Sequence, residues 1–217
     1  MTLKRKALYR YHETQEMDDL HERKVEGIVL KSILYKEHDR IVTLMTSQAG
    51  LISFLAKRVK TPEKTALLSP FSQIELIYQK KNSDLYTFKD GTLLSAHLKL
   101  REKWNYLDIA GKMGNLILTT QLPGKPTPLL YTLFIACLKQ LPHFEDPMTL
   151  LLLFHLKLLT HEGVLSWEKP GPLPLHPWET LKELALSRSF QSIQKKRGLG
   201  ALYEGLKTTL SSSSAVS

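Results

Sequence analysis

A change of hydrophobic period near residue 100 is the sequence feature that most constrains the fold of this chain. Before it, short runs rich in Val, Ile, Thr, Phe and Tyr are separated by Gly, Asp and Pro, as strands are. After it, apolar residues recur every three or four positions, which is the spacing of one helix face. The pattern predicts an α+β protein in which a β domain precedes an all-helical domain.

Five segments of the N-terminal half have strand character. They span 25–33, 39–46, 51–56, 71–78 and 85–98, with a turn expected at Asp90-Gly91 inside the last one. Short strands at this spacing are typical of a small barrel or a sandwich. Such a domain needs aromatic side chains inside, so Phe54 and Phe71 are predicted to be core residues.

The first helix of the C-terminal half begins after about Leu100 and ends at Pro123-Gly124. Its apolar stripe, which is predicted to be buried, consists of Trp104, Leu107, Ala110, Met113, Ile117 and Leu118. The second helix has Thr127 as its N-cap and Pro128 at its first position. Its expected buried face consists of Leu130, Leu133, Phe134, Cys137, Leu138 and Leu141.

A third helix is capped by Asp146 and closed by Gly163. It is apolar almost all round, which predicts a place in the middle of a bundle. A fourth helix begins near Pro177, and a weaker helical segment covers 202–206. The predicted domains are therefore an N-terminal extension over 1–23, a β domain over 24–99, a helical domain over 100–210 and a disordered Ser-rich tail over 211–217.

The net charge points to an anionic partner. The chain has 217 residues, with 30 Lys and Arg against 21 Asp and Glu, which gives +9. An excess of this size is typical of proteins that bind nucleic acid or an anionic membrane surface, although it can also serve solubility alone. Met17 is an alternative start, so residues 1–16 are expected to be dispensable. We expect a soluble, cytoplasmic protein, because the N-terminus lacks the apolar segment of a secretory signal and the most apolar stretch, 150–159, has about half the ~20 residues that a membrane span needs.

Cations are concentrated on segments that connect the predicted strands. Lys57, Arg58, Lys60 and Lys64 lie between the third and fourth strands, Lys80 and Lys81 lie between the fourth and fifth, and Lys31, Lys36 and Arg40 flank the first turn. Such a track neutralises phosphates and gives affinity without sequence preference. Of the aromatic residues near these strands, Tyr35 and Tyr78 are the candidates for base stacking.

Nothing in the sequence indicates catalysis. It contains none of the nucleophile-elbow, phosphate-loop, dinucleotide-binding or zinc-protease motifs. His155 and His161 are about 240° apart on one helix, so they do not share a face. The single cysteine, Cys137, lies in an apolar run and is expected to be buried. We therefore predict a protein that is not an enzyme and that has no cofactor and no metal site.

One set of motifs resembles a known family. The motifs are Glu26-Gly-Ile-Val-Leu-Lys, Tyr35-x-Glu37-x-Asp39-Arg-Ile-Val-Thr-Leu-Met-Thr, Gly50, Ala56-Lys-Arg-Val-Lys and Leu68-Ser-Pro-Phe71. In order and spacing they are similar to the N-terminal domain of RecO over residues 24–101. The helical half is similar more loosely, through Asp146-Pro147 and the Leu-rich helix that follows.

The resemblance implies a five-stranded oligonucleotide-binding (OB) barrel followed by a helical domain. It also implies binding of single- and double-stranded DNA, strand annealing, and a nucleoid-associated role in recombinational repair. The implied partners are RecR, the single-stranded-DNA-binding protein SSB and, indirectly, RecA, which is loaded onto SSB-coated strands. The DNA contacts carried over are Lys57, Arg58, Lys60 and Lys64, with Arg40 and Lys31 as secondary ones.

The helical half departs from the family in one respect. Many RecO relatives carry a four-cysteine zinc module after the Leu-rich helix, whereas residues 163–178 of this chain contain no cysteine. Zinc is therefore not expected to bind. We also expect a groove for the acidic, aromatic-ended SSB tail, beside cations such as Lys139 and Lys157.

Two other readings share these features. An RNA-binding OB module with a helical adaptor would have the same charge and the same barrel. A protein-interaction scaffold would bind through its helical half and carry its charge incidentally. Competition between single-stranded DNA and RNA separates the first reading from a DNA mediator, and absence of nucleic-acid binding at physiological salt would favour the second.

Overall fold

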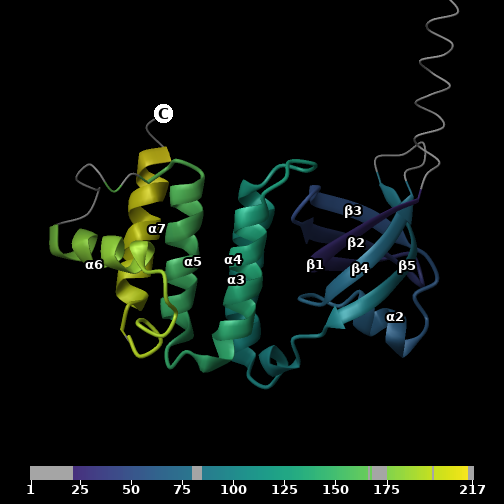
Figure 1. Ribbon diagram of the computed structural model, residues 1–217, viewed down its shortest axis with the longest axis horizontal. Coiled ribbons are helices and arrows are strands. Elements are labelled where there is room, and N and C mark those ends of the chain that lie inside the picture. Colours follow the sequence, from purple (N-terminus) through teal and green to yellow (C-terminus); the bar gives the residue numbers. More distant parts are fainter. Residues whose placement is uncertain (1–21, 80–84, 166, 168–174, 197, 215–217) are drawn as a thin grey trace, which may run out of the picture. The chain divides into compact units, whose positions relative to one another are not determined.

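The protein is described here from a computed structural model covering residues 22–79, 85–165, 167, 175–196 and 198–214 (Figure 1). The predictions on Lys80, Lys81 and nearly all of the N-terminal extension lie outside these residues. The chain forms two compact units. Unit 1 contains the described residues up to Ala96 together with Gln121–Pro128, and unit 2 contains His97–Thr120 and the residues from Leu129 onward.

Unit 1 is a closed five-stranded barrel. Its strands are β1 (Glu22–Tyr35), β2 (Asp39–Thr46), β3 (Gly50–Ala56), β4 (Gln73–Gln79) and β5 (Tyr86–Ser95), and helix α2 (Pro62–Leu67) lies between β3 and β4. The strand order is β1-β2-β3-β5-β4, with a parallel β3–β5 pair and antiparallel pairs elsewhere. This is the five-stranded OB arrangement, so the predicted fold class is confirmed.

The long first strand closes the barrel because it serves two neighbours. Residues from Glu22 pair with β4, and residues up to Tyr35 pair with β2, with a register shift between Val29 and Lys31. A shift of this kind bends a strand and increases its twist. The core inside is apolar, and Phe54 is fully buried and stacks on Phe88 at a centroid distance of 5.8 Å. Phe71 is also buried, so both core predictions are confirmed.

The prediction of a turn at Asp90-Gly91 is wrong. Strand β5 continues through both residues to Ser95 and pairs with β4 along its length, with register shifts that bend it. The Asp90 carboxylate accepts the Gly91 backbone N–H at 2.8 Å, a local bond that an Asp-Gly pair makes in a bent strand as well as in a turn. Closing a small barrel requires such bends, and their residues resemble turn residues.

Unit 2 is helical. Its elements are η1 (Leu98–Arg101), α3 (Trp104–Thr120), α4 (Pro128–Gln140), η2 (Leu141–His143), α5 (Pro147–His161), α6 (Leu175–Leu186) and α7 (Gly200–Ser214). Helix α5 is central and packs against α3, α6 and α7. Asp146 caps it by accepting the Met148 N–H at 3.0 Å, and Gly163 follows it at φ +72°. These features confirm the predictions for the third helix.

Two helical predictions differ from the structure. Helix α3 buries Tyr106, Ile109, Ala110, Met113, Gly114 and Ile117, a stripe rotated away from the predicted one. Trp104 therefore lies outside the packed face and is 82% exposed. Helix α7 extends to Ser214, past the predicted start of the Ser-rich tail. Among the described residues, no helix has the length and apolar character that a membrane crossing requires.

Candidate nucleic-acid interface

The connection from β3 to α2 is fixed against the turn between β1 and β2. The Asp39 carboxylate accepts the Arg58 backbone N–H at 3.0 Å, and the His38 carbonyl accepts the Val59 N–H at 2.7 Å. Val59 is buried in the barrel core, whereas its neighbours Lys57, Arg58 and Lys60 are exposed. The connection that carries Lys57, Arg58 and Lys60 therefore meets the turn that carries Lys36 at one end of the barrel.

Next to these cations, the outer side of β1, β2 and β3 carries polar and apolar side chains in rows. Cross-strand partners share one face of a sheet and alternate residues change face. The registers place one set of residues on this side, hereafter the barrel face: Lys31, Ile33, Tyr35, Ile41, Thr43, Ser53 and Leu55. The Tyr35 side chain is 44% exposed, and the Lys36 ammonium lies 5.5 Å from its ring centroid. The barrel face thus offers an aromatic ring beside positive charge.

Arg40 points to the opposite side of this hairpin from Lys31. It pairs with Leu34 and Ala56, and its guanidinium donates to the Ser32 hydroxyl at 3.3 Å. The structure therefore does not bring these two predicted contacts onto one face. Arg40 remains half-buried at the edge of the barrel.

Lys64 lies on α2, one step removed from the other cations. Thr61 caps this short helix by accepting the Lys64 backbone N–H at 3.3 Å. Leu67 and Leu68, at the other end of the helix, are buried in the barrel core. The helix thus covers the barrel with its apolar end and leaves the Lys64 side chain exposed.

Tyr78, by contrast, lies inside the barrel. Its side chain is 5% exposed and contacts the Tyr86 ring edge-on at a centroid distance of 4.9 Å. Burial raises the pKa of Tyr78, with a further contribution from Tyr86. A ring in this position has no open face for a base, so only Tyr35 of the two predicted stacking residues stays a candidate. The alternation Ile74, Leu76, Tyr78 along β4 carried this information, because all three share the inward face.

Cys137 and His155, two side chains with nucleophilic or acid–base chemistry, are buried in unit 2. Among the described residues, no group of three or more His, Cys, Asp and Glu side chains is arranged to hold a metal ion. Cys137 is fully buried, and burial raises the pKa of its thiol, so it is not available as a thiolate nucleophile. His155 is also buried, and desolvation together with the nearby Lys207 lowers its pKa.

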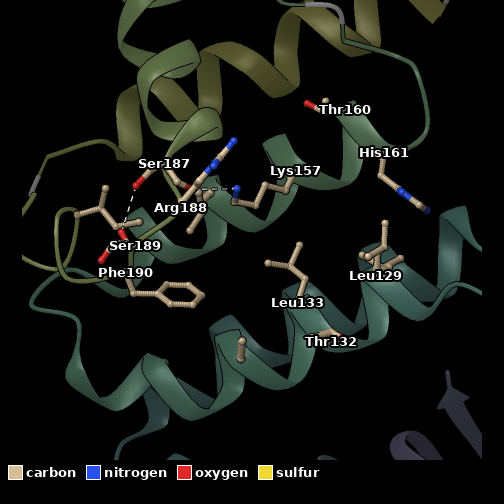
Figure 2. Close-up of a pocket in the computed structure, with 14 residues that line it drawn as sticks. Leu129, Thr132, Leu133, Lys157, Thr160, His161, Ser187, Arg188, Ser189 and Phe190 are labelled. Carbon is tan, nitrogen blue, oxygen red and sulfur yellow. Dashed lines mark hydrogen bonds between the residues drawn. The ribbon is translucent and has the colours of Figure 1, made fainter.

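A hollow lies within unit 2, between α4, α5 and the segment after α6 (Figure 2). Its volume is about 510 Å³. The apolar part of its lining comes mainly from Leu129, Leu130, Leu133, Ala136, Leu153, Phe190 and Ile193, and its basic side chains are Lys157, His161 and Arg188. We call it the α4–α5 groove. Lys139, which was also expected beside such a groove, does not line it.

Lys157 and Arg188, the lysine and the arginine of this groove, differ in their contacts. The Lys157 ammonium donates to the carbonyls of Ala185 at 2.9 Å and Ser187 at 3.1 Å, where α6 ends. Burial lowers the pKa of Lys157. Its side chain in Figure 2 extends toward the segment after α6 and is engaged there. Arg188 is exposed at the rim, so it is the better placed of the two to meet a ligand.

Comparison with known proteins finds a family model for the barrel and relatives that match about 65% of the chain. The profile described as "Recombination protein O N terminal" matches residues 17–97, which include all five strands. DNA repair protein RecO of Chlamydia pneumoniae is 31% identical over 144 residues, covering 65% of this chain. The barrel matches the RecO N-terminal domain, and the chain is similar to RecO proteins beyond it. The resemblance seen in the β1–β3 motifs is thereby confirmed.

Other RecO proteins match to a similar degree. DNA repair protein RecO of Bacillus subtilis is 31% identical over 143 residues, and that of Chlamydia muridarum is 33% identical over 144 residues. These matches cover 65% and 64% of this chain. The chain spans 57%, 56% and 60% of the lengths of the Chlamydia pneumoniae, Bacillus subtilis and Chlamydia muridarum proteins. The activity and the partners of the whole RecO protein are therefore proposals for this chain.

Proposed function

We propose that this protein is a non-enzymatic DNA-binding recombination mediator. In this role it binds single- and double-stranded DNA, anneals complementary strands and helps RecA onto SSB-coated single strands during recombinational DNA repair. RecR and SSB are its proposed partners, by the resemblance to RecO. The names of the relatives, which are DNA repair proteins, support the general role.

The observation that carries the proposal is the pairing of the β3–α2 connection with the first turn. Asp39 accepts the Arg58 N–H and is also the strand partner of Tyr35, so the connection that carries Lys57, Arg58 and Lys60 is held at the end of the hairpin where Tyr35 lies. Cations next to an exposed aromatic ring suit a single strand, because the cations neutralise phosphates and the ring stacks on a base. Neither interaction reads sequence, as a repair mediator requires.

Annealing needs no covalent step. Two complementary strands repel each other through their phosphates, and a protein that neutralises part of that charge lets the bases meet. Release of counterions from each phosphate provides the affinity, and this affinity falls as salt increases. A surface of lysine and arginine side chains on a rigid barrel can perform this task.

The proposal is tested by strand annealing with complementary oligonucleotides, one carrying a fluorophore and the other a quencher. We expect the protein to accelerate annealing, and to do so also when both strands are coated with SSB. Acceleration should decrease steeply between 50 and 200 mM salt, as expected for phosphate contacts, for which 6–10 contacts lose roughly 10³–10⁵ in affinity over that range.

Three outcomes would contradict all or part of this proposal. An unchanged annealing rate with naked DNA would remove the annealing role. Preference for RNA over DNA of equal length and sequence would favour an RNA-binding OB module instead. Acceleration with naked strands but not with SSB-coated ones would leave an annealer that is not a mediator.

We further propose that the α4–α5 groove holds the acidic, aromatic-ended tail of SSB. Its apolar lining accommodates an aromatic side chain, and Arg188 at the rim complements a carboxylate. The resemblance to RecO suggested this partner, and the groove supports it with suitable chemistry.

Reversing the charge of Arg188 should weaken tail binding. We expect Arg188→Glu to weaken binding of a labelled acidic peptide ending in Phe by about tenfold or more, because a charge-assisted hydrogen bond worth roughly 1.5–3 kcal/mol becomes a repulsion. Fluorescence anisotropy measures the affinity. Lys139→Glu is the matched control, since it makes the same charge change outside the groove and should have a much smaller effect. Equal effects of the two substitutions would show that the peptide senses only net charge.

A further inference from the structure

Helix α3 begins with an exposed aromatic side chain, Trp104. Trp104 is 82% exposed, although Trp is among the most highly buried residue types on average. It is the first residue of a 17-residue helix that has no acidic residue in its first turn. The indole is therefore largely open to solvent and lies where a helix attracts negative charge.

Cations immediately precede this indole. Lys99, Arg101 and Lys103 are exposed and come at alternate positions just before it, with Glu102 as the only acidic residue among them. The Lys103 ammonium lies 5.3 Å from the Tyr106 ring centroid, which holds this lysine at the start of α3. The segment therefore has a local excess of positive charge next to an open aromatic ring.

Beyond Trp104 the same side of α3 is hollowed. The hollow, about 460 Å³, is lined by Trp104, Leu107, Asp108, Gly111, Lys112, Asn115, Leu116 and Tyr203. A Cβ on Gly111 would meet no heavy atom of the described residues within 4 Å, so the helix backbone is open to approach there. The Lys112 ammonium is paired with the Asp108 carboxylate at 2.7 Å, so the hollow itself is nearly neutral. Charge is thus placed before the indole, and apolar and amide groups are placed after it.

We propose that Trp104, with Lys99, Arg101 and Lys103, forms a second contact for single-stranded nucleic acid, located on the helical unit. The cations complement the phosphates, Trp104 stacks on a base, and the hollow beside Gly111 accepts the next base, within reach of the Asn115 amide. This inference rests on the proposed function, and it extends it. Annealing requires that two strands be held at once, and one molecule with two separate contacts can hold both.

Charge favours this occupant over a protein segment. An acidic peptide would find the cations but no carboxylate partner in the hollow, where Lys112 is already paired. An apolar peptide would offer no negative charge to Lys99, Arg101 and Lys103. A single strand uses the cations, the indole face and the neutral hollow together, because its phosphates and bases alternate along the chain.

The test uses the full chain and four variants with substitutions on unit 2 or on the barrel. Trp104→Ala should weaken binding of an oligo-dT by about 5- to 100-fold, the range expected for loss of one stacked base. Trp104→Phe should retain most of the affinity, because Phe also stacks. Binding of duplex DNA should be nearly unchanged by either substitution, since paired bases are not free to stack. Leu98→Ala, which removes another exposed apolar side chain of unit 2, should behave like the wild type.

A fluorescence readout separates stacking from an indirect effect. Addition of oligo-dT should quench part of the tryptophan emission of the wild type, and this part should be absent from Trp104→Phe although that variant still binds. The fourth variant, in which Lys57, Arg58 and Lys60 are all alanine, should retain the quenching at saturating DNA. Circular dichroism and melting temperature should match the wild type for Trp104→Ala, because the side chain is exposed.

The outcomes separate this inference from the proposed function. If Trp104→Ala binds oligo-dT like the wild type while the barrel variant loses affinity, the inference is overturned and the proposed function stands. If the wild type binds no DNA, both are overturned. If Trp104→Ala keeps its DNA affinity but loses a protein partner, the surface is a protein interface and the inference is again overturned.

Discussion

Replacing Lys57, Arg58 and Lys60 together by alanine is expected to weaken binding to DNA of any sequence by about 50-fold at 0.15 M salt. The estimate follows from three phosphate contacts to a single strand, each of which contributes about 0.7 to the slope of log affinity against log salt. The slope itself should become shallower by about two. Single strands of different sequence should lose affinity alike, because phosphate contacts carry no sequence information. A duplex should lose somewhat more, because each contact to it contributes about 0.9 to the slope.

The structure makes this triple substitution a clean test. All three side chains are exposed, and the bond from Arg58 to Asp39 uses the backbone N–H, which alanine retains. The barrel should therefore fold as before. Salt titrations by fluorescence anisotropy with a dT oligomer and a duplex give both affinity and slope.

A control variant separates the effect of lower net charge from the effect of where the charges lie. The matched control replaces Lys139, Lys182 and Lys195 by alanine, which removes the same three charges from the helical unit. We expect a change of less than about threefold and a slope close to that of the wild type, since none of these three lysines is a predicted phosphate contact. A triple barrel variant that matched this control would show that the predicted DNA contacts are elsewhere.

The sequence was sufficient for the fold wherever local signals dominate. The strand pattern indicated a small barrel or a sandwich, the resemblance to RecO implied the barrel, and the Asp146 cap with Gly163 delimits α5. These features depend on residues close in the chain, such as a side-chain oxygen that accepts a nearby N–H. The cations were also found from sequence, because exposed connections tolerate charge and buried strands do not.

What the sequence did not reveal depends on tertiary contacts. The bond between Asp39 and Arg58 joins two segments 19 residues apart, and no local pattern indicates it. The exposure of Trp104 follows from which side of α3 meets α5, and the predicted apolar stripe did not indicate that side. Tyr78 is a different case, because the alternation along β4 did indicate its inward position.

The segment Gln121–Pro128 is the clearest example of a non-local contact. It lies between two helices in the sequence, yet it packs with unit 1. Gly50 forms a bridge with Pro123, and the Gly124 N–H donates to the Leu51 carbonyl at 3.1 Å. The segment thus covers the start of β3, and Gly50 is the point of closest approach.

Substituting Gly50 with alanine should destabilise the barrel strongly. A Cβ at this position would lie 2.1 Å from the Lys125 carbonyl oxygen and 2.6 Å from its carbon, so the backbone of 121–128 must move. The position also has φ +62°, which costs a side-chain-bearing residue about 1–2 kcal/mol. We expect a total loss of about 3 kcal/mol or more in the free energy of unfolding of unit 1, since displacing the segment also breaks its bonds to β3.

Gly124→Ala separates the two causes of this loss. Gly124 has φ +74°, but a Cβ there would meet no heavy atom of the described residues within 4 Å. It should therefore lose only the conformational part, about 1–2 kcal/mol. Urea unfolding measures both variants, and amide hydrogen exchange at Leu51 and in residues 121–128 locates the change. Gly50→Ala should accelerate exchange in both places, because the segment no longer seats on β3. Equal losses in the two variants, with unchanged exchange at Leu51, would mean that residues 121–128 do not pack on the barrel.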